Sequence, residues 1–163
     1  QAFIEAIAAA RSNIRISTPY FLPPQTLFDT LRSAARSGVK VELIVPTKSD
    51  VLVAGRATDS YVRECVEAGI TVYRYRNGFL HSKTIVIDDS VVAVGSANMD
   101  YRSLEYNLEA MAFIYDRAVA EDYISKFHAD ASVSELVAAR RFDSRPFATR
   151  LTEGIARLLA PIL

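Results

Sequence analysis

The feature that most constrains this fold is a regular alternation of amphipathic helical segments with short β-prone runs in the first half of the chain. The helical segments are 3–8, 27–35 and 54–68, and the β-prone runs are 14–18, 41–45 and a segment that starts at Ile70. Gly38 and Gly69 follow the second and third helical segments, where glycine commonly ends a helix. Short strand–helix–strand connections form right-handed parallel crossovers, so we predict a parallel βαβαβ sheet covered by helices.

The second half of the chain breaks this alternation and predicts antiparallel strands. Residues 83–87 and 91–95 are apolar runs separated by three polar residues, which is typical of a buried β-hairpin. A further strand is expected at 108–115 and a helix at 117–129. We therefore predict an α/β fold whose mixed sheet joins the parallel βαβαβ part to an antiparallel hairpin. With half its residues apolar and 23% charged, the chain has the balance of one globular domain spanning 1–163.

Composition disfavours several classes of protein. The 19 Lys and Arg residues balance the 19 Asp and Glu residues, so the positive charge that usually supports nucleic-acid binding is missing. Cys65 is the only cysteine, which excludes an internal disulfide. No run approaches the ~20 apolar residues of a membrane span, so we expect the chain itself to be soluble. It begins at Gln1, inside an expected helix, which suggests that it was cut from a longer protein.

The segment 141–163 predicts an amphipathic C-terminal tail. Its apolar residues recur mostly at helical spacing, with Arg150 and Arg157 nearby. These apolar residues are Phe147, Leu151, Ile155, Leu158, Leu159 and Ile162. Such a stripe either packs on an apolar surface of the protein or lies at a membrane interface near anionic lipid, and we favour packing.

Polar residues border the predicted hairpin in a pattern that brings functional groups together. Side chains alternate along a strand, so His81 and Lys83 project from the same face. If 89–90 is a two-residue turn, Lys83 lies opposite Ser96 and His81 lies opposite Asn98. We therefore expect these four side chains to converge, and a register that differs by one residue would break this convergence.

The converging groups suit an anionic phosphorus centre. Lys83 supplies positive charge, and Ser96 and Asn98 supply neutral donors for non-bridging oxygens. A ring nitrogen of His81 can attack phosphorus or protonate a departing oxygen, since histidine exchanges protons near neutral pH. Glu109, on the next expected strand, is a candidate to accept the proton on the other ring nitrogen and so orient the imidazole. This chemistry requires no metal or cofactor, and we expect none.

The chain resembles the phospholipase D superfamily in residues 81–109, which read HSKTIVIDDSVVAVGSANMDYRSLEYNLE. The signature of that superfamily is H-x-K-x4-D followed by G-S-x-N. Within the superfamily the chain resembles the C-terminal half of bacterial cardiolipin synthases, over segments that include 17–21, 45–50, 78–81 and 160–163. The motif positions show no departure from the pattern, and the other half is missing.

The resemblance implies a phospholipase D-like fold and metal-independent transphosphatidylation through a phosphohistidine intermediate, with two motifs that contribute one histidine each. The implied catalytic residues are His81, Lys83, Asp88 and Glu109, and the implied phosphate-binding residues are Lys83, Ser96 and Asn98. Because the nucleophile of two-motif members is usually the N-terminal histidine, the resemblance implies an acid–base role for His81.

The resemblance also implies partners and a location. The expected substrate is a phospholipid, by resemblance phosphatidylglycerol, and the expected protein partner is the N-terminal half of the same enzyme or a homodimer mate. The full-length protein is expected at the cytoplasmic side of the bacterial inner membrane. Peripheral contact of this chain with the membrane is left as an open alternative. We expect the isolated chain to be inactive unless it self-associates.

Several alternatives stay open. One is a single-motif phosphodiesterase or nuclease that is active as a homodimer. The zero net charge disfavours the nuclease. Another is a non-catalytic lipid-binding module, which the full polar set disfavours. Asp88 has the opposite strand parity from His81, and a structural role as a cap of the hairpin turn is favoured over a catalytic one. Tyr20 and Asp50 follow expected parallel strands, whose ends commonly border ligand sites, but structural roles are equally plausible.

Overall fold

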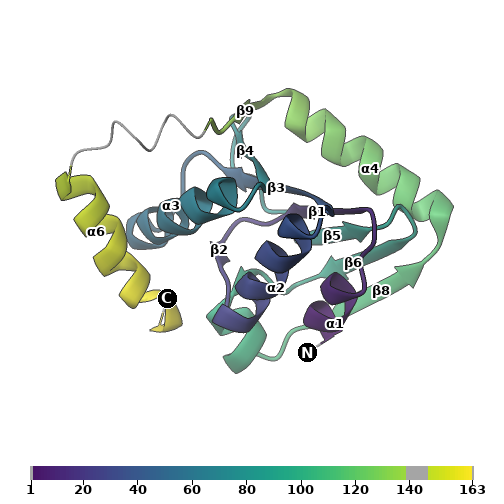
Figure 1. The fold of residues 1–163 in the computed structure, drawn as a ribbon, viewed down its shortest axis with the longest axis horizontal. Coiled ribbons are helices and arrows are strands. Elements are labelled where there is room, and N and C mark those ends of the chain that lie inside the picture. Colours follow the sequence, from purple (N-terminus) through teal and green to yellow (C-terminus); the bar gives the residue numbers. More distant parts are fainter. Residues whose placement is uncertain (1, 139–146, 163) are drawn as a thin grey trace.

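The computed structural model describes residues 2–138 and 147–162, which are arranged around one mixed sheet (Figure 1). The helices are α1 (Ala2–Ala8), α2 (Gln25–Arg36), α3 (Leu52–Glu67), α4 (Arg117–Ser132) and α6 (Phe147–Leu158), together with a π-helix η1 (Arg102–Tyr106) and a 3-10 helix η2 (Ala160–Ile162). The strands are β1 (Asn13–Ser17), β2 (Phe21–Leu22), β3 (Lys40–Pro46), β4 (Thr71–Tyr75), β5 (Thr84–Ile87), β6 (Val91–Gly95), β7 (Met99–Asp100), β8 (Met111–Tyr115) and β9 (Ser134–Leu136). The main sheet has the order β8-β6-β5-β1-β3-β4-β9, which confirms the predicted mixed sheet.

Three parallel strands form the centre of the sheet, as the sequence alternation predicts. β1 pairs in parallel with β3, and β3 with β4, so the carboxyl ends of all three strands lie at one edge. Helix α2 connects β2 to β3 and buries Leu27, Phe28 and Leu31 along one stripe. The chain turns from α2 into β3 at Gly38, whose φ of 95° is a left-handed value that glycine adopts without a Cβ clash.

The antiparallel hairpin of β5 and β6 is present, but its register differs from the expected one. Ile87 pairs with Val91, so the turn contains three residues, 88–90, instead of two. Asp88 and Asp89 both adopt positive φ values, 49° and 53°, a conformation that aspartate tolerates better than most non-glycine residues. These two left-handed residues add the extra position to the turn.

The longer turn changes every cross-strand pair of the hairpin. The Gly95 N–H donates to the Lys83 carbonyl oxygen over 3.4 Å, so Lys83 lies beside Gly95. The predicted opposition of Lys83 to Ser96, and of His81 to Asn98, is therefore wrong. β6 ends at Gly95, and the chain beyond it leaves the main sheet.

Three shorter features differ from the sequence expectation. The strand expected at 108–115 begins only at Met111. β9 adds an edge strand antiparallel to β4, which nothing in the sequence pattern indicates. β2 and β7 form a separate parallel pair, and Thr18 supports it by accepting a hydrogen bond from the Met99 N–H over 3.2 Å.

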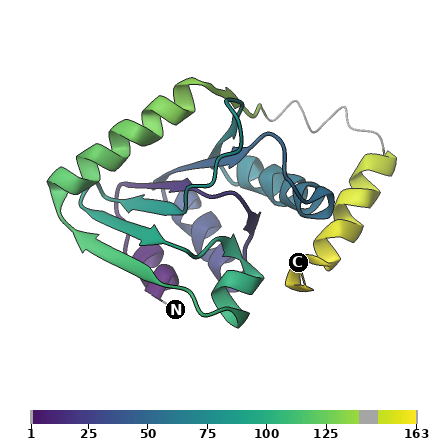
Figure 2. The same ribbon diagram turned by 180° about the vertical axis from the view of Figure 1, so that it is seen from behind.

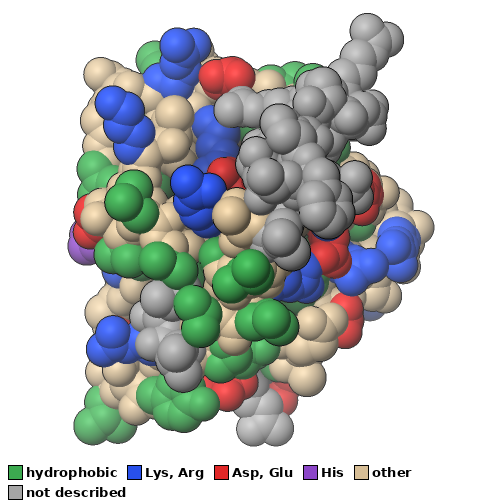
Figure 3. All heavy atoms as spheres, turned by 90° about the vertical axis from the view of Figure 1, so that its left-hand side faces the viewer, with side chains coloured by type: hydrophobic (Ala, Val, Ile, Leu, Met, Phe, Trp, Pro, Cys, Tyr) green, Lys and Arg blue, Asp and Glu red, His purple; other side chains and the backbone are tan. Residues whose placement is uncertain are grey.

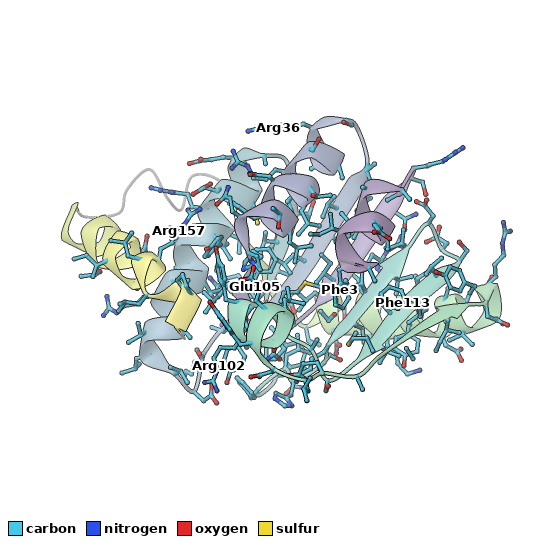
Figure 4. The ribbon with its side chains drawn as sticks, turned by 90° about the horizontal axis from the view of Figure 1, so that it is seen from below. Phe3, Arg36, Arg102, Glu105, Phe113 and Arg157 are labelled. Carbon is cyan, nitrogen blue, oxygen red and sulfur yellow. The ribbon has the colours of Figure 1, made fainter. Side chains whose placement is uncertain are left out.

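Helices cover both faces of the sheet. The main core lies on the side of α1, α2 and α3 (Figure 1), where Phe28 and Tyr61 stack edge to face with ring centroids 5.1 Å apart. Phe3 of α1 contacts Phe113 of β8 on the same side, with centroids 5.7 Å apart (Figure 4). Helix α4 packs on the other face (Figure 2), where Phe127 joins a cluster with Ile44.

The predicted C-terminal helix packs on α3, which agrees with packing rather than with a free helix. Arg157 forms an ion pair with Glu64 and lies over the Tyr61 ring, 4.3 Å from its centroid (Figure 4). The described members of the expected apolar stripe do not form the packed face, because Leu158 is 80% exposed and Ile155 is 52% exposed. Figure 3 views the molecule from the side on which α6 lies in Figure 1, and it shows hydrophobic side chains exposed on that side.

Part of the predicted tail lies outside the described residues, namely residues 141–146 and Leu163, and the side chains of residues 147–151 and Ile162. None of the helices in the described ranges is both long and apolar enough to span a membrane.

Candidate active site

The expected site residues lie at the edge of the sheet where the parallel strands end. Ser17, the last residue of β1, pairs with Thr84, the first residue of β5, so His81 and Lys83 reach this edge just before β5. Glu109 reaches the same edge because β8, which starts two residues later, runs antiparallel to β6. Carboxyl ends of parallel strands commonly border ligand sites.

His81 and Lys83 make a direct polar contact. Lys83 Nζ lies 3.2 Å from His81 Nε2, and it also donates to the His81 carbonyl oxygen over 3.1 Å. An ammonium group has donors only, so Nε2 can accept this bond only in the tautomer that carries the ring proton on Nδ1. The pKa of Lys83 lies below its ordinary value of 10.5 because burial penalises the charge, although the Glu109 and Asp100 carboxylates partly offset this. Lys83 is therefore a partly desolvated cation, and a bound anion would stabilise its charge.

Glu109 lies in the electrostatic field of Lys83 but is not bonded to His81. Its Oε1 accepts a hydrogen bond from Asn107 Nδ2 over 3.3 Å. Within the part of the chain that the structure describes, no hydrogen bond joins Glu109 to His81. The orienting role expected for Glu109 therefore stays a prediction.

Ser96 and Asn98 approach the edge by a different route from the predicted cross-strand pairs. Ser96 Oγ accepts a hydrogen bond from the Ala110 N–H over 3.0 Å, which fixes the chain next to Glu109. Asn98 lines a cavity of about 190 Å³ together with Asp100. Its Oδ1 atom is buried and has no hydrogen-bond partner among the described residues. Because buried polar atoms are nearly always paired, this oxygen is available to a donor that enters the cavity.

The chain matches a family model over residues 3–131, and that family is described as the cardiolipin synthase, phospholipase D-like domain. The chain belongs to this family. The match spans the H-x-K-x4-D and G-S-x-N segments, and the resemblance to this family is confirmed.

Relatives of the cardiolipin synthase family match nearly the whole chain. The major cardiolipin synthase ClsA of Bacillus subtilis is 44% identical over 161 residues. Cardiolipin synthase 1 of Staphylococcus epidermidis is 40% identical, and a cardiolipin synthase of Staphylococcus aureus is 41% identical. Each match covers 99% of this chain and 33% of the relative, so the chain spans about a third of the length of these relatives.

Solved structures at low identity share the fold of this cardiolipin synthase-type domain. A crystal structure of NUC from Salmonella typhimurium, a phospholipase D family member, has a TM-score of 0.73 and 22% identity, over 83% of this chain and 88% of that one. The phosphatidylserine synthase of Haemophilus influenzae has a TM-score of 0.75 and 20% identity, over 98% of this chain and 44% of that one. The phospholipase D-like fold is therefore confirmed.

Asp88, the acidic residue of the family motif, lies at the opposite end of β5 from His81. Its carboxylate accepts hydrogen bonds from the backbone N–H groups of Arg11 (2.9 Å), Ser12 (2.8 Å) and Asn13 (3.1 Å). Burial alone would raise the pKa of Asp88, but these bonds outweigh it and hold the pKa below 3.8. In this structure Asp88 caps the turn between α1 and β1, so its expected catalytic role has no support from the geometry.

Tyr20, Asp50 and Phe79 also border the site. The sequence indicated two of them, Tyr20 and Asp50, only through their positions after expected parallel strands. Tyr20 donates a hydrogen bond to Asp50 Oδ1 over 2.6 Å, which joins the segments after β1 and β3. Burial, and next this bond, raise the pKa of Tyr20 to about 12, so the phenol stays protonated at neutral pH. The Phe79 ring lies between them and His81, 6.5 Å from Tyr20 and 5.8 Å from His81 by ring centroids.

The described residues contain no group of three or more His, Cys, Asp or Glu side chains arranged to hold a metal ion. The polar groups at the edge are one imidazole, one ammonium, carboxylates and amide or hydroxyl groups. This set can bind a phosphate through Lys83 and neutral donors, and it can move a proton or form a bond through a nitrogen of His81.

Proposed function

We propose that this chain is the C-terminal catalytic half of a cardiolipin synthase-type phosphatidyltransferase. The observation that carries the proposal is the contact of 3.2 Å between Lys83 Nζ and His81 Nε2 at the strand-end edge, in a chain of the cardiolipin synthase family. A cation beside an imidazole nitrogen can hold the phosphodiester while the nitrogen handles a proton.

The proposed reaction has two in-line steps at one phosphorus atom. In the first step a histidine nitrogen of the second motif forms an N–P bond, the bond from phosphorus to the departing alkoxide breaks, and His81 gives that oxygen a proton. In the second step His81 takes the proton of the acceptor hydroxyl, the hydroxyl oxygen bonds to phosphorus, and the N–P bond breaks. Lys83 stabilises the charge on the non-bridging oxygens in both steps.

Support for a second motif comes from chemistry and from chain length. One histidine cannot easily be the phosphorus ligand and also the proton donor on the opposite side of an in-line displacement. The chain spans about a third of its cardiolipin synthase relatives, which leaves length for another half. We infer that the missing half or a second copy supplies the nucleophile, and that the isolated monomer is inactive.

The proposed substrate is a phospholipid, with phosphatidylglycerol as both donor and acceptor. The proposed location of the full-length protein is the cytoplasmic side of the bacterial inner membrane. Exposed apolar side chains of α6, such as Leu158, support peripheral contact of this half with lipid or with the other half.

The test uses phosphatidylglycerol vesicles and the chain combined with its upstream half, with cardiolipin measured by mass spectrometry. His81→Asn should abolish product formation. The matched control is His128→Asn, because His128 is exposed on α4 and should tolerate the change. Loss of activity in both variants, or in neither, would contradict the proposed role of His81. Activity that survives His81→Asn would favour the non-catalytic lipid-binding alternative for this chain.

A homodimeric phosphodiesterase is the second candidate, and one observation favours it. The NUC chain of Salmonella typhimurium is matched over 88% of its length, so a chain of this fold and size exists without a second half. In that case hydrolysis of bis(p-nitrophenyl) phosphate by the chain alone should rise with the square of its concentration. A purified monomer that cleaves this diester at the rate of the intact enzyme would contradict both candidates.

A further inference from the structure

A second cavity, lined by both apolar and charged side chains, adjoins the candidate site at the carboxyl ends of β3 and β4. Its volume is about 570 Å³, and it is lined by the two segments 47–50 and 75–79 that follow these strands. Gly78 has a φ of 102°, a left-handed value that helps the second segment turn back, so that Arg76 and Phe79 line the same space. This cavity belongs to neither the His81–Lys83 pair nor the Asn98 pocket.

The charges of this cavity favour a singly charged anion. Lys48 and Arg76 line it with exposed side chains, and neither has an ion-pair partner within the described ranges. Asp50 is the carboxylate among the lining residues, and its Oδ1 is bound by the Tyr20 hydroxyl. Two cations and one carboxylate leave one net positive charge. A phosphodiester carries one negative charge, whereas a phosphate monoester carries nearly two.

Phe79 connects this cavity to the candidate site. Its ring lines the cavity, is 43% exposed, and lies 5.8 Å from the His81 ring by centroids. One aromatic ring therefore separates the cavity from the imidazole. A ligand with a phosphodiester in the cavity can present a hydroxyl group, carried on a short carbon bridge past Phe79, to His81.

We propose that the cavity of Lys48, Arg76 and Phe79 is the subsite that binds the phosphodiester of the acceptor lipid. This inference rests on the proposed function. In the second step the acceptor oxygen bonds to phosphorus, the N–P bond breaks, and His81 takes the hydroxyl proton. An acceptor held by Lys48 and Arg76 supplies this hydroxyl, whereas water has no group for the cavity to hold. The cavity therefore favours transfer to lipid over hydrolysis.

The direct test is binding of glycerophosphoglycerol, a soluble phosphodiester, to the 163-residue chain, followed by amide NMR of residues 47–50 and 76–79. The titration is done in a Lys83→Met background, which weakens phosphate binding at the site beside His81. The cavity variant is Lys48→Gln with Arg76→Gln. The matched control is Arg36→Gln with Lys126→Gln, which removes the same charge from exposed positions on α2 and α4. Unchanged thermal denaturation establishes that the variants are folded.

We expect the diester to shift these amides, the cavity variant to weaken binding by roughly tenfold or more, and the control to bind as the parent does. Shifts confined to the neighbourhood of His81, or binding that survives in the cavity variant, would overturn the proposal. Inorganic phosphate is the competing probe. If it binds more tightly than the diester, the cavity is a general phosphate site and the assignment to an acceptor headgroup is wrong. If the diester does not bind and the cavity variant instead fails to associate with the upstream half, the cavity is a protein interface.

A second measurement separates this inference from the proposed function. In the full-length enzyme with phosphatidylglycerol vesicles, the cavity variant should lower the ratio of cardiolipin to phosphatidate at least severalfold while phosphatidyl turnover continues. An unchanged ratio overturns the acceptor assignment. A complete lack of turnover in the unaltered enzyme contradicts the proposed function instead, and the NMR titration still decides whether the cavity binds the diester.

Discussion

Replacement of Asp88 tests whether the aspartate of H-x-K-x4-D acts in the chemistry or in the fold. Its carboxylate accepts three backbone N–H groups, from Arg11, Ser12 and Asn13, and also the Ser12 hydroxyl. A hydrogen bond to a charged group contributes about 1.5–3 kcal/mol, and water can partly replace the bonds here because most are exposed. We expect Asp88→Ala to lower the free energy of unfolding by about 2–4 kcal/mol, including about 1 kcal/mol of strain for alanine at positive φ. Asp88→Asn keeps one acceptor oxygen and should cost about 1–2 kcal/mol.

Urea denaturation of the chain measures these changes, with Asp89→Asn as the matched control. Asp89 has nearly the same φ, 53°, but its exposed carboxylate contacts Arg15 and Asn13 side chains instead of backbone groups. Exposed ion pairs contribute about 0–1 kcal/mol, so this control should stay within that range. In the full-length enzyme, Asp88→Asn should keep its turnover once the folded fraction is taken into account.

The effect of Asp88 should depend on pH in a defined direction. The pKa of the folded carboxylate lies below its ordinary value of 3.8, so its stabilisation is complete above that value and is lost as the pH falls through the folded pKa. The stability difference between the parent and Asp88→Asn should therefore shrink in acid. If Asp88→Asn abolishes turnover and leaves the urea midpoint unchanged, the aspartate acts in catalysis and the structural interpretation is refuted.

Three further outcomes follow from other contacts of the fold. Gly95→Ala should destabilise the protein by about 2 kcal/mol or more, measured by thermal denaturation, because a Cβ atom there would lie 2.0 Å from the Ala110 carbonyl oxygen. Arg157→Gln removes the ion pair with Glu64, so hydrogen exchange should become faster in α6 and stay unchanged in α4 on the other face of the sheet, with a loss of about 1 kcal/mol. Cys65 is fully buried and burial raises the pKa of its thiol, so iodoacetamide should alkylate it only as fast as the protein unfolds, as followed by mass spectrometry.

The sequence predicted the parallel part of the fold because one physical signal dominates there. The apolar stripe of 27–35 and the glycine at position 38 both indicate a helix that packs on a sheet and then turns into a strand. The hairpin was also predictable as a hairpin. Its register was not, because the register depends on the φ angles of Asp88 and Asp89, and either a two-residue or a three-residue turn fits the same apolar runs.

The candidate site was predictable in its residue types and less so in its contacts. His81 and Lys83 lie together because they are two residues apart before one strand. Ser96 instead bonds to the Ala110 backbone, and the chain after Tyr101 forms a π-helix, a rare geometry with no recognisable sequence pattern. The bond from Tyr20 to Asp50 joins residues 30 positions apart and needs the tertiary fold to be seen.

The charge balance of the candidate site gives a physical reason to expect a second motif. Lys83 is the cation that touches His81, and the Glu109 and Asp100 carboxylates act on its pKa from nearby. Arg102 lines the same pocket as Asp100, so one ammonium, one guanidinium and two carboxylates leave this half of the site without net positive charge to attract a phosphodiester. A second lysine, supplied by the other half, would make the net charge of the complete site positive. The Lys48 and Arg76 cavity already carries net positive charge, so in the isolated chain a soluble diester should occupy that cavity in preference to the His81 site.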